Sequence, residues 1–298
     1  MNNPSSAPTR DDPLLGTPYE CIRLLGAGGM GQVLVARERS TDRKVAVKLI
    51  RKRFGHMPDL VERFYAEAKA ASQTGHAHIV EVLDFGTTQE NRPYMVMELL
   101  PGKNLHEFIY YERRLEQTLA IDICRQLCDG LGAAHVRGVV HRDLKPANVF
   151  LVDGMDHDPF VKILDFGLAQ LTHPNKIPEV PIRIYGTPEY MAPEMARPER
   201  PTEAPADVYS LGVLLYQMLT GDIPFSHDDP KKIVQCHLNT VPQPPRERAP
   251  DAGIHPALQR VVLKALRKRP ERRYLSMEEM SRSLWKVERQ IAKDGQVP

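Results

Sequence analysis

The sequence lacks the features that mark several classes of protein. No apolar run is long enough to span a membrane, and no signal-peptide pattern is present. There are only four cysteines, and their spacing is not that of a metal site, which favours a reducing compartment. The net charge of +2 is too small to predict binding to nucleic acid or to a membrane surface. We therefore expect a cytoplasmic protein, tethered to a membrane only if a longer parent chain continues past Pro298.

Composition is that of a folded domain, with polar ends. Hydrophobic residues make up 42% and charged residues 26% of the 298 positions, which suits a globular protein with a substantial core. Residues 1–17 are rich in proline and poor in apolar groups, so we predict a disordered tail there. Residues 293–298 are expected to form a short C-terminal tail.

The stretch HRDLKPAN at residues 141–148 concentrates polar groups between apolar runs. Buried or half-buried polar groups need partners or a polar ligand. An ordinary polar turn with a satisfied histidine and an Arg–Asp pair is the alternative. Catalytic groups sit preferentially on loops held by rigid elements, which favours a functional role.

A second motif, LLGAGGMGQV at residues 24–33, contains the glycine spacing G-x-G-x-x-G. Alone this is a weak signal, because dinucleotide-binding folds share it. Here the apolar runs 33–36 and 45–50 flank a polar turn, and no helix opens at the glycines, whereas a Rossmann unit requires one. The pattern predicts a glycine hairpin whose backbone N–H groups bind phosphates.

Lys48 lies in the otherwise apolar strand 45–50 and Glu67 in the predicted helix 59–73. Glu67 falls on the same face as Phe64 and Ala71, and a carboxylate on a buried face is costly unless it is paired. A strand lysine that reaches solvent from an edge is the alternative. We predict an ion pair between Lys48 and Glu67.

The remaining pattern alternates short strands with long helices. Strands are predicted at 79–85, 94–100 and 160–164, and helices at 116–136, 208–219 and 277–291. The strand at 160–164 ends in Asp165-Phe166-Gly167, and Ala192-Pro193-Glu194 follows later. The acidic turn at 153–159 is interpreted as solvated rather than metal-binding, because adjacent residues cannot easily converge on one ion.

These motifs, in this order, resemble the eukaryotic-type (Hanks-type) Ser/Thr protein kinase domain and are similar to bacterial members. The resemblance covers about residues 19–292. It implies an α+β bilobal fold, with a small antiparallel β-sheet lobe carrying one main helix at residues 18–100. A larger, mainly helical lobe would occupy residues 101–292, with ATP and Mg²⁺ (or Mn²⁺) between the two.

The resemblance also assigns roles to individual residues. Asp143 would be the catalytic base, Lys145 would contact the γ-phosphate, and Thr187 would hydrogen-bond both. Lys48, held by Glu67, would bind the α- and β-phosphates. Asn148 and Asp165 would ligate the metal ion. The implied ATP-binding set is Leu25, Gly26, Ala27, Gly28, Gly29, Met30, Gly31, Val33, Ala46, Lys48, Met97, Glu98, Leu100 and Phe150.

Three further residues are assigned structural roles. Glu194 should pair with Arg273 as a buried link. Asp207 should hold the backbone of the catalytic loop, and capping of the following helix is its alternative role.

The segment 168–186 departs from the usual kinase pattern. Only Thr172 and Tyr185 carry a hydroxyl group there. We hypothesise that activation-loop phosphorylation is absent or atypical, and that Arg142 pairs with Glu179 instead of a phosphate.

The resulting prediction is a Mg²⁺-dependent Ser/Thr protein kinase that acts on protein substrates and serves in signalling. A homodimer through the small lobe is compatible with this prediction, and no nucleic-acid partner is expected. A pseudokinase scaffold is the first alternative, opposed by the presence of Lys48, Glu67, Asp143, Asn148 and Asp165. A small-molecule kinase is the second, opposed by the peptide-docking segment around Gly186-Thr187.

Overall fold

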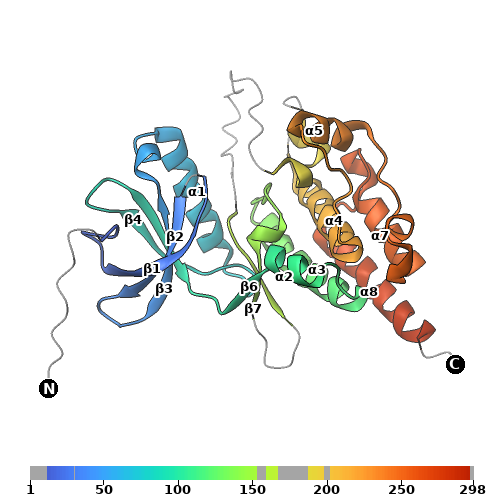
Figure 1. Cartoon of the computed structure of the whole chain (residues 1–298), viewed down its shortest axis with the longest axis horizontal. Coiled ribbons are helices and arrows are strands. Elements are labelled where there is room, and N and C mark those ends of the chain that lie inside the picture. The colour runs from blue at the N-terminus through green and yellow to red at the C-terminus, as the bar shows by residue number, and fades with distance from the viewer. Residues whose placement is uncertain (1–11, 30, 153–158, 167–186, 198–201, 296–298) are drawn as a thin grey trace. The chain divides into compact units, whose positions relative to one another are not determined.

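The structure is a computed structural model that describes residues 12–29, 31–152, 159–166, 187–197 and 202–295 (Figure 1). It divides into two compact units: one runs to Gly75 and includes Val80–Leu100, and the other comprises His76–Ile79 and the chain from Pro101 onward. Predictions on Met30, the turn at 153–158, Gly167, Thr172, Glu179 and Tyr185 lie outside the described residues. Below, the units are called the small and the large unit.

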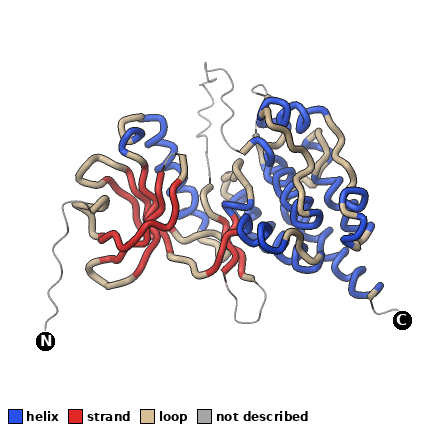
Figure 2. The backbone as a smooth tube through the Cα atoms, in the orientation of Figure 1, coloured by secondary structure: helices blue, strands red, loops and turns tan. Residues whose placement is uncertain are grey.

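The small unit is built on a five-stranded antiparallel sheet in the order β1-β2-β3-β5-β4 (Figure 2). Its main helix is α1, Pro58–Thr74, preceded by a 3₁₀ turn at Lys52–Phe54. Consecutive strands β1, β2 and β3 pair as antiparallel neighbours, which short connections favour. The strands are β1 Tyr19–Ala27, β2 Gly31–Glu38, β3 Lys44–Ile50, β4 Val82–Thr87 and β5 Pro93–Glu98.

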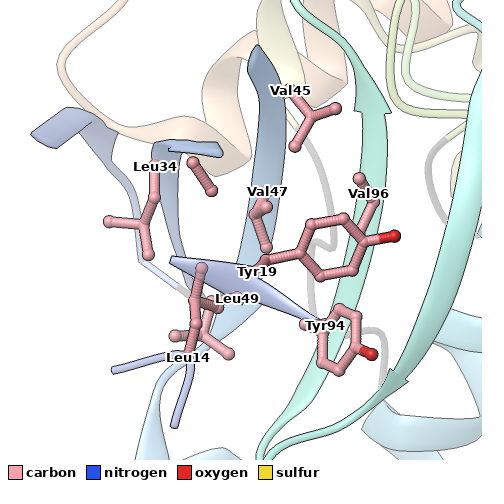
Figure 3. Packing of buried hydrophobic residues seen from close by; sticks show 9 residues of the cluster. Leu14, Tyr19, Leu34, Val45, Val47, Leu49, Tyr94 and Val96 are labelled. Carbon is pink, nitrogen blue, oxygen red and sulfur yellow. The ribbon is translucent and has the colours of Figure 1, made fainter. Parts of the chain in front are cut away.

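Strand periodicity places a hydrophobic cluster on one of the two faces of this sheet. Side chains alternate between faces along a strand, and paired residues share a face. Val47 pairs with Leu34 and Val96, and all three are buried on one face (Figure 3). The cluster on this face comprises Leu14, Tyr19, Leu34, Ala36, Val45, Val47, Leu49, Tyr94 and Val96.

Leu14 belongs to this core, which corrects our prediction of disorder up to residue 17. Its side chain is fully buried, and its N–H donates to the Asp12 Oδ1 at 2.9 Å. The turn is closed by the Thr17 hydroxyl, which donates to the Leu14 carbonyl at 2.7 Å, and Gln89 N donates to the Leu15 carbonyl at 3.1 Å. One apolar side chain and these bonds are enough to order residues 12–17, and the composition of the segment did not reveal them.

The large unit is mainly helical. It also holds a small three-stranded sheet of β6 Gly102–Asn104, β7 Val149–Val152 and β8 Phe160–Ile163. Within the described parts of the chain, no helix is both long and apolar enough to cross a membrane. The α-helices of the large unit are α2 Leu105–Glu112, α3 Gln117–Val136, α4 Ala204–Thr220, α5 Pro230–Asn239, α6 Pro245–Arg248, α7 Pro256–Ala265 and α8 Met277–Asp294. Short 3₁₀ turns lie at Pro146–Asn148, Pro188–Tyr190, Pro193–Ala196, Pro250–Ala252 and Pro270–Arg272.

The predicted helices at 116–136 and 277–291 are confirmed as α3 and α8, which pack against each other. Each buries one stripe, as a helix covering a core should. The predicted helix at 208–219 begins earlier, at Ala204. Pro205 stands in its first turn, where proline is well tolerated, so the start was missed by reading only the apolar run.

A buried histidine in the large unit should make its stability depend on pH. His237 is only 1% exposed, and its Nδ1 lies 2.8 Å from the Tyr209 hydroxyl. Burial, reinforced by the charge of Lys268, lowers the pKa of His237 from 6.5 to about 4. As the pH falls below 6.5, His237 therefore binds a proton in the unfolded chain but not in the folded chain. The free energy of unfolding decreases between pH 6.5 and about pH 4.

We expect His237 to account for on the order of 3 kcal/mol of stability lost between neutral pH and pH 4. Urea unfolding at several pH values, followed by the fluorescence of the single tryptophan, Trp285 in α8, measures this. His237→Gln keeps an acceptor for the Tyr209 hydroxyl and should flatten the slope. His106→Gln, at an exposed position in α2, is the matched control. An unchanged slope in His237→Gln would contradict the assignment.

Candidate active site

Candidate nucleotide-binding residues of the small unit lie on the face of the sheet opposite the Leu14 cluster. Lys48 pairs with Val33 on β2 and with Met95 on β5, while Ala46 pairs with Met97. Paired residues share a face, and positions two apart along a strand do too, so all five lie on one side. The resemblance assigns four of them, Val33, Ala46, Lys48 and Met97, to ATP, and the strand register brings these four together.

Helix α1 covers this same face near Lys48. Ile50, two residues after Lys48, packs with Phe64 and Ala68 of α1. Glu67 lies in the same helix, three positions after Phe64. The Glu67 side chain is outside the described part of the structure, and the Lys48–Glu67 ion pair stays a prediction.

The glycine-rich segment forms the tip of the β1–β2 hairpin, as predicted. Ala27 pairs with Gln32, and Gly28 N donates to the Gly31 carbonyl at 2.9 Å. Gly31 is required by close packing: an added Cβ would lie 2.8 Å from the Leu49 carbonyl oxygen. Strand β1 is followed by the glycine turn and then by strand β2. In the described residues no helix begins at the glycines, which excludes the dinucleotide-binding arrangement.

In the large unit, Asp207 fixes the backbone of the segment 141–148. This fully buried carboxylate accepts hydrogen bonds from His141 N at 2.8 Å, from Arg142 N at 2.9 Å and from His135 Nε2 at 2.7 Å. Burial alone would raise the pKa of Asp207, but the bond from His135 and its neighbouring charges outweigh burial and lower it. The predicted loop-holding role is confirmed. The capping role is wrong, because residue 207 lies inside α4, whose cap position is Glu203.

Arg142 adopts a left-handed backbone conformation, with φ of 64°, which is uncommon for a residue with a side chain. Two nearby residues of the loop are buried: His141, which precedes Arg142, and Leu144, two positions after it, which is 1% exposed. The Arg142 guanidinium donates to the Thr202 carbonyl at 3.2 Å. Strained backbone of this kind persists only where the surroundings fix it, and here Asp207 does so.

Asp143 is the central acidic group of the loop. Its Oδ2 accepts from Lys145 Nζ at 2.7 Å and from Asn148 Nδ2 at 3.3 Å. The same Asn148 Nδ2 donates to the Asp143 carbonyl at 2.9 Å. Both side-chain bonds end on Oδ2, and among the described residues none ends on Oδ1. The loop thus presents one oriented carboxylate oxygen together with a lysine ammonium.

The predicted metal ligands are brought close by the backbone. Leu164 N donates to the Asn148 carbonyl at 2.8 Å, and Asp165 is the next residue, with φ of 45°. His141 Nε2 donates to the Leu164 carbonyl at 3.0 Å, and its ring lies 4.9 Å from that of buried Phe166. This network joins Asp165, two residues after the end of β8, to the segment 141–148.

Asn148 and Asp165 suit a hard cation. Because Asn148 Nδ2 donates to Asp143, the Asn148 side-chain oxygen is left for another partner. In the described part of the chain no group of three or more His, Cys, Asp or Glu could hold a metal by itself. An amide oxygen and a carboxylate, completed by phosphate oxygens and water, are the donor set that Mg²⁺ accepts.

Thr187 lines a small cavity beside Asp143. The other lining residues are Arg142, Leu144, Tyr190, Met191 and Met195. We expected hydrogen bonds from Thr187 to Asp143 and Lys145, but the described structure contains neither. Among the described residues, the Asp143 carboxylate is bonded to Lys145 and Asn148, and Thr187 is its neighbour in the cavity lining.

Glu194 and Arg273 form the buried pair that the sequence predicted. Two bonds of 2.7 Å join the guanidinium to the two carboxylate oxygens, and the residues are 4% and 2% exposed. The guanidinium also donates to the carbonyls of Arg267, Pro205 and Lys268. The pair therefore fixes the segment around Glu194 to the helical core, which agrees with the predicted structural link.

A small antiparallel sheet with one main helix, together with a helical unit that carries an oriented Asp-x-Lys-x-x-Asn loop, defines a kinase-type phosphotransferase domain. A family model described as a protein kinase domain matches residues 19–286, so the chain belongs to the protein kinase family.

Sequence relatives are bacterial. The chain is 41% identical over 280 residues to "Serine/threonine-protein kinase Pkn1" of Myxococcus xanthus, covering 92% of this chain and 40% of that protein. It is 37% identical to "Serine/threonine-protein kinase PknB" of Mycolicibacterium smegmatis, covering 95% of this chain and 44% of that protein. The chain thus spans about half the length, or less, of the curated relatives it matches.

The fold is also that of a solved kinase domain. The crystal structure of the Mycobacterium tuberculosis PknI kinase domain superposes with a TM-score of 0.71 at 23% identity, covering 93% of this chain and 99% of that one. This likeness supports the α+β kinase fold.

Proposed function

We propose that this chain is a Ser/Thr protein kinase that transfers the γ-phosphate of ATP to Ser and Thr hydroxyls of protein substrates. The observation that carries the proposal is the Asp143 carboxylate, fixed by Lys145 and Asn148 through one oxygen. Family membership supports the activity, and the bacterial relatives named as Ser/Thr-protein kinases support the acceptor class.

The roles of the residues follow from charge and geometry. Asp143 Oδ1 would accept the proton of the substrate hydroxyl and orient its oxygen toward the γ-phosphorus. Lys145, already adjacent to that carboxylate, would hold the γ-phosphate as negative charge moves to the leaving group. Thr187, which lines the cavity beside Asp143, would form one side of the position of the substrate hydroxyl.

The nucleotide would be held by the small unit. The glycine-rich turn, with Gly26, Gly28, Gly29 and Gly31, would bind its phosphates chiefly through the Gly29 N–H, together with the Lys48 ammonium. Val33, Ala46 and Met97 would contact the adenine ring. Backbone groups of Glu98 and Leu100 would hydrogen-bond the adenine edge. The remaining members of the proposed nucleotide set are Leu25, Ala27, Met30 and Phe150.

Mg²⁺, or Mn²⁺, would be held by Asn148 and Asp165. When bound, it neutralises phosphate charge and orients the triphosphate. Glu67, through Lys48, would act as a positioning residue for the phosphates.

The purified chain should incorporate phosphate from ATP into a generic protein substrate, on Ser and Thr, only when Mg²⁺ or Mn²⁺ is present. Radiolabelled ATP, phosphoamino-acid analysis and a chelator control measure this. Transfer to small alcohols in preference to protein would favour the small-molecule alternative. ATP binding without any transfer would favour a pseudokinase.

Three sequence predictions are retained without a structural test: cytoplasmic location, a homodimer through the small unit, and absent or atypical activation-loop phosphorylation. Peptide mapping of autophosphorylated protein decides the last, because stoichiometric phosphate at Thr172 that is essential for activity would overturn it. Sedimentation velocity over a range of concentrations decides the homodimer.

A further inference from the structure

Two arginines that the sequence analysis left unassigned contact the glycine-rich turn. Arg51 donates two hydrogen bonds to the Gly28 carbonyl, from Nε at 3.1 Å and from Nη2 at 3.0 Å. Arg53 Nη2 donates to the Gly29 carbonyl at 3.4 Å. All four residues belong to the small unit. Two consecutive carbonyls of the turn are therefore held by cationic side chains.

Strand register explains why the arginines reach the turn. Gly31, the first residue of β2, pairs with Ile50, the last residue of β3. The chain beyond Ile50 consequently continues beside the tip of the β1–β2 hairpin. Residues Lys52–Phe54 then form a 3₁₀ turn, and the Arg53 guanidinium lies 4.6 Å from the centre of the Phe54 ring.

These bonds fix the direction of a peptide plane. In a trans peptide the C=O and the following N–H point in opposite directions, and the described chain contains no cis bond. Holding the Gly28 carbonyl toward Arg51 therefore directs the Gly29 N–H away from Arg51. Glycines can rotate such planes at little steric cost, so an external constraint matters here more than in an ordinary turn.

The other nearby donor is already used. Gly28 N donates to the Gly31 carbonyl within the hairpin. Backbone N–H groups bind phosphate well only when they are oriented before the ligand arrives, because ordering them costs free energy. Guanidinium groups on the carbonyl side add positive potential at the same place.

We propose that Arg51, assisted by Arg53, is a positioning residue that orients the glycine-rich turn for the phosphates of a nucleoside di- or triphosphate. This inference rests on the nucleotide binding of the proposed function. Arg51 acts through the backbone and does not itself have to touch the nucleotide. A guanidinium fork is needed, because a lysine ammonium cannot make both bonds to one carbonyl in this geometry.

The test compares ligands that share adenine but differ in phosphate. Isothermal titration of the whole chain with ADP, and separately with adenosine, should show that Arg51→Lys weakens ADP binding by about tenfold, the loss expected for a charge-assisted hydrogen bond. Adenosine affinity should change by less than about twofold. Arg53→Lys, with its single longer bond, should weaken ADP binding less.

A matched control is Arg37→Lys. Arg37 lies on β2 at the opposite end of the same strand pair, facing Lys44, and pairs only with exposed Asp42 at 3.2 Å in the described structure. It should leave both affinities unchanged. Hydrogen exchange of the turn amides should rise in Arg51→Lys and not in the control.

The outcomes separate the two proposals. A wild-type chain that binds neither ADP nor ATP overturns the proposed function. Wild-type binding that Arg51→Lys leaves intact, or weakens equally for ADP and adenosine, overturns the positioning role alone. Tighter ADP binding by Arg51→Lys would also overturn it, because the arginine would then hold the turn away from its binding conformation.

Discussion

Asp143→Asn should lower the rate of phosphoryl transfer by about 10²–10⁴-fold. The substitution keeps the size and planarity of the side chain, so Leu144 and the loop backbone, held by Asp207, should stay in place. What is lost is the carboxylate that accepts the proton and the negative charge that pairs with Lys145 at 2.7 Å.

Nucleotide affinity should change far less than the rate, because the groups assigned to the nucleotide lie mainly in the small unit. Single-turnover phosphate transfer and ADP titration on the same preparations measure the two effects separately. Asp251→Asn, which alters an exposed aspartate paired with Arg114, is the matched control and should leave the rate unchanged. Activity retained by Asp143→Asn would exclude this residue as the base.

Removal of one partner of the Glu194–Arg273 pair should destabilise the large unit by about 3–5 kcal/mol. Both groups are almost completely buried, and the carboxylate accepts two bonds of 2.7 Å from the guanidinium. Arg273→Met would leave Glu194 charged and unpaired in the interior. It would also remove a donor from the carbonyls of Arg267, Pro205 and Lys268, so the loss should fall at the upper end.

Urea unfolding followed by Trp285 fluorescence reports on the large unit and measures this loss. Arg114→Met breaks an ion pair of the same 2.7 Å length, with Asp251, but at the surface. Its unfolding midpoint should hardly move, because exposed pairs are screened by water. Equal effects of Arg114→Met and Arg273→Met would show that burial is not the cause.

Much of the fold could be predicted because local patterns decide it. Short apolar runs placed β3 and β5, helical stripes placed α1, α3 and α8, and glycines without a following helix defined the hairpin. Errors arose where distant partners decide the outcome. Leu14 is ordered by packing against side chains from four strands of the sheet. The early start of α4 is a different error, because the proline in its first turn is a local signal that was missed.

The candidate site divides in the same way. The polar cluster between apolar runs marked residues 141–148 as functional, and the resemblance to the kinase domain assigned roles to Asp143, Lys145, Asn148 and Asp165. No motif could show that Asn148 bonds to Asp143, or that Thr187 stands beside Asp143 without a hydrogen bond to it. Arg51 and Arg53 were overlooked because basic residues after a strand usually face solvent.

The sequence by itself determined which chemical groups this protein has and in which elements they lie, since side-chain periodicity and turn residues act over a few positions. Only the tertiary structure decided which groups meet. Asp207 holds a loop 66 positions away, and Arg51 reaches a glycine 23 positions before it. Such contacts depend on strand register and on the need of buried polar atoms for partners, and neither can be calculated from a local pattern.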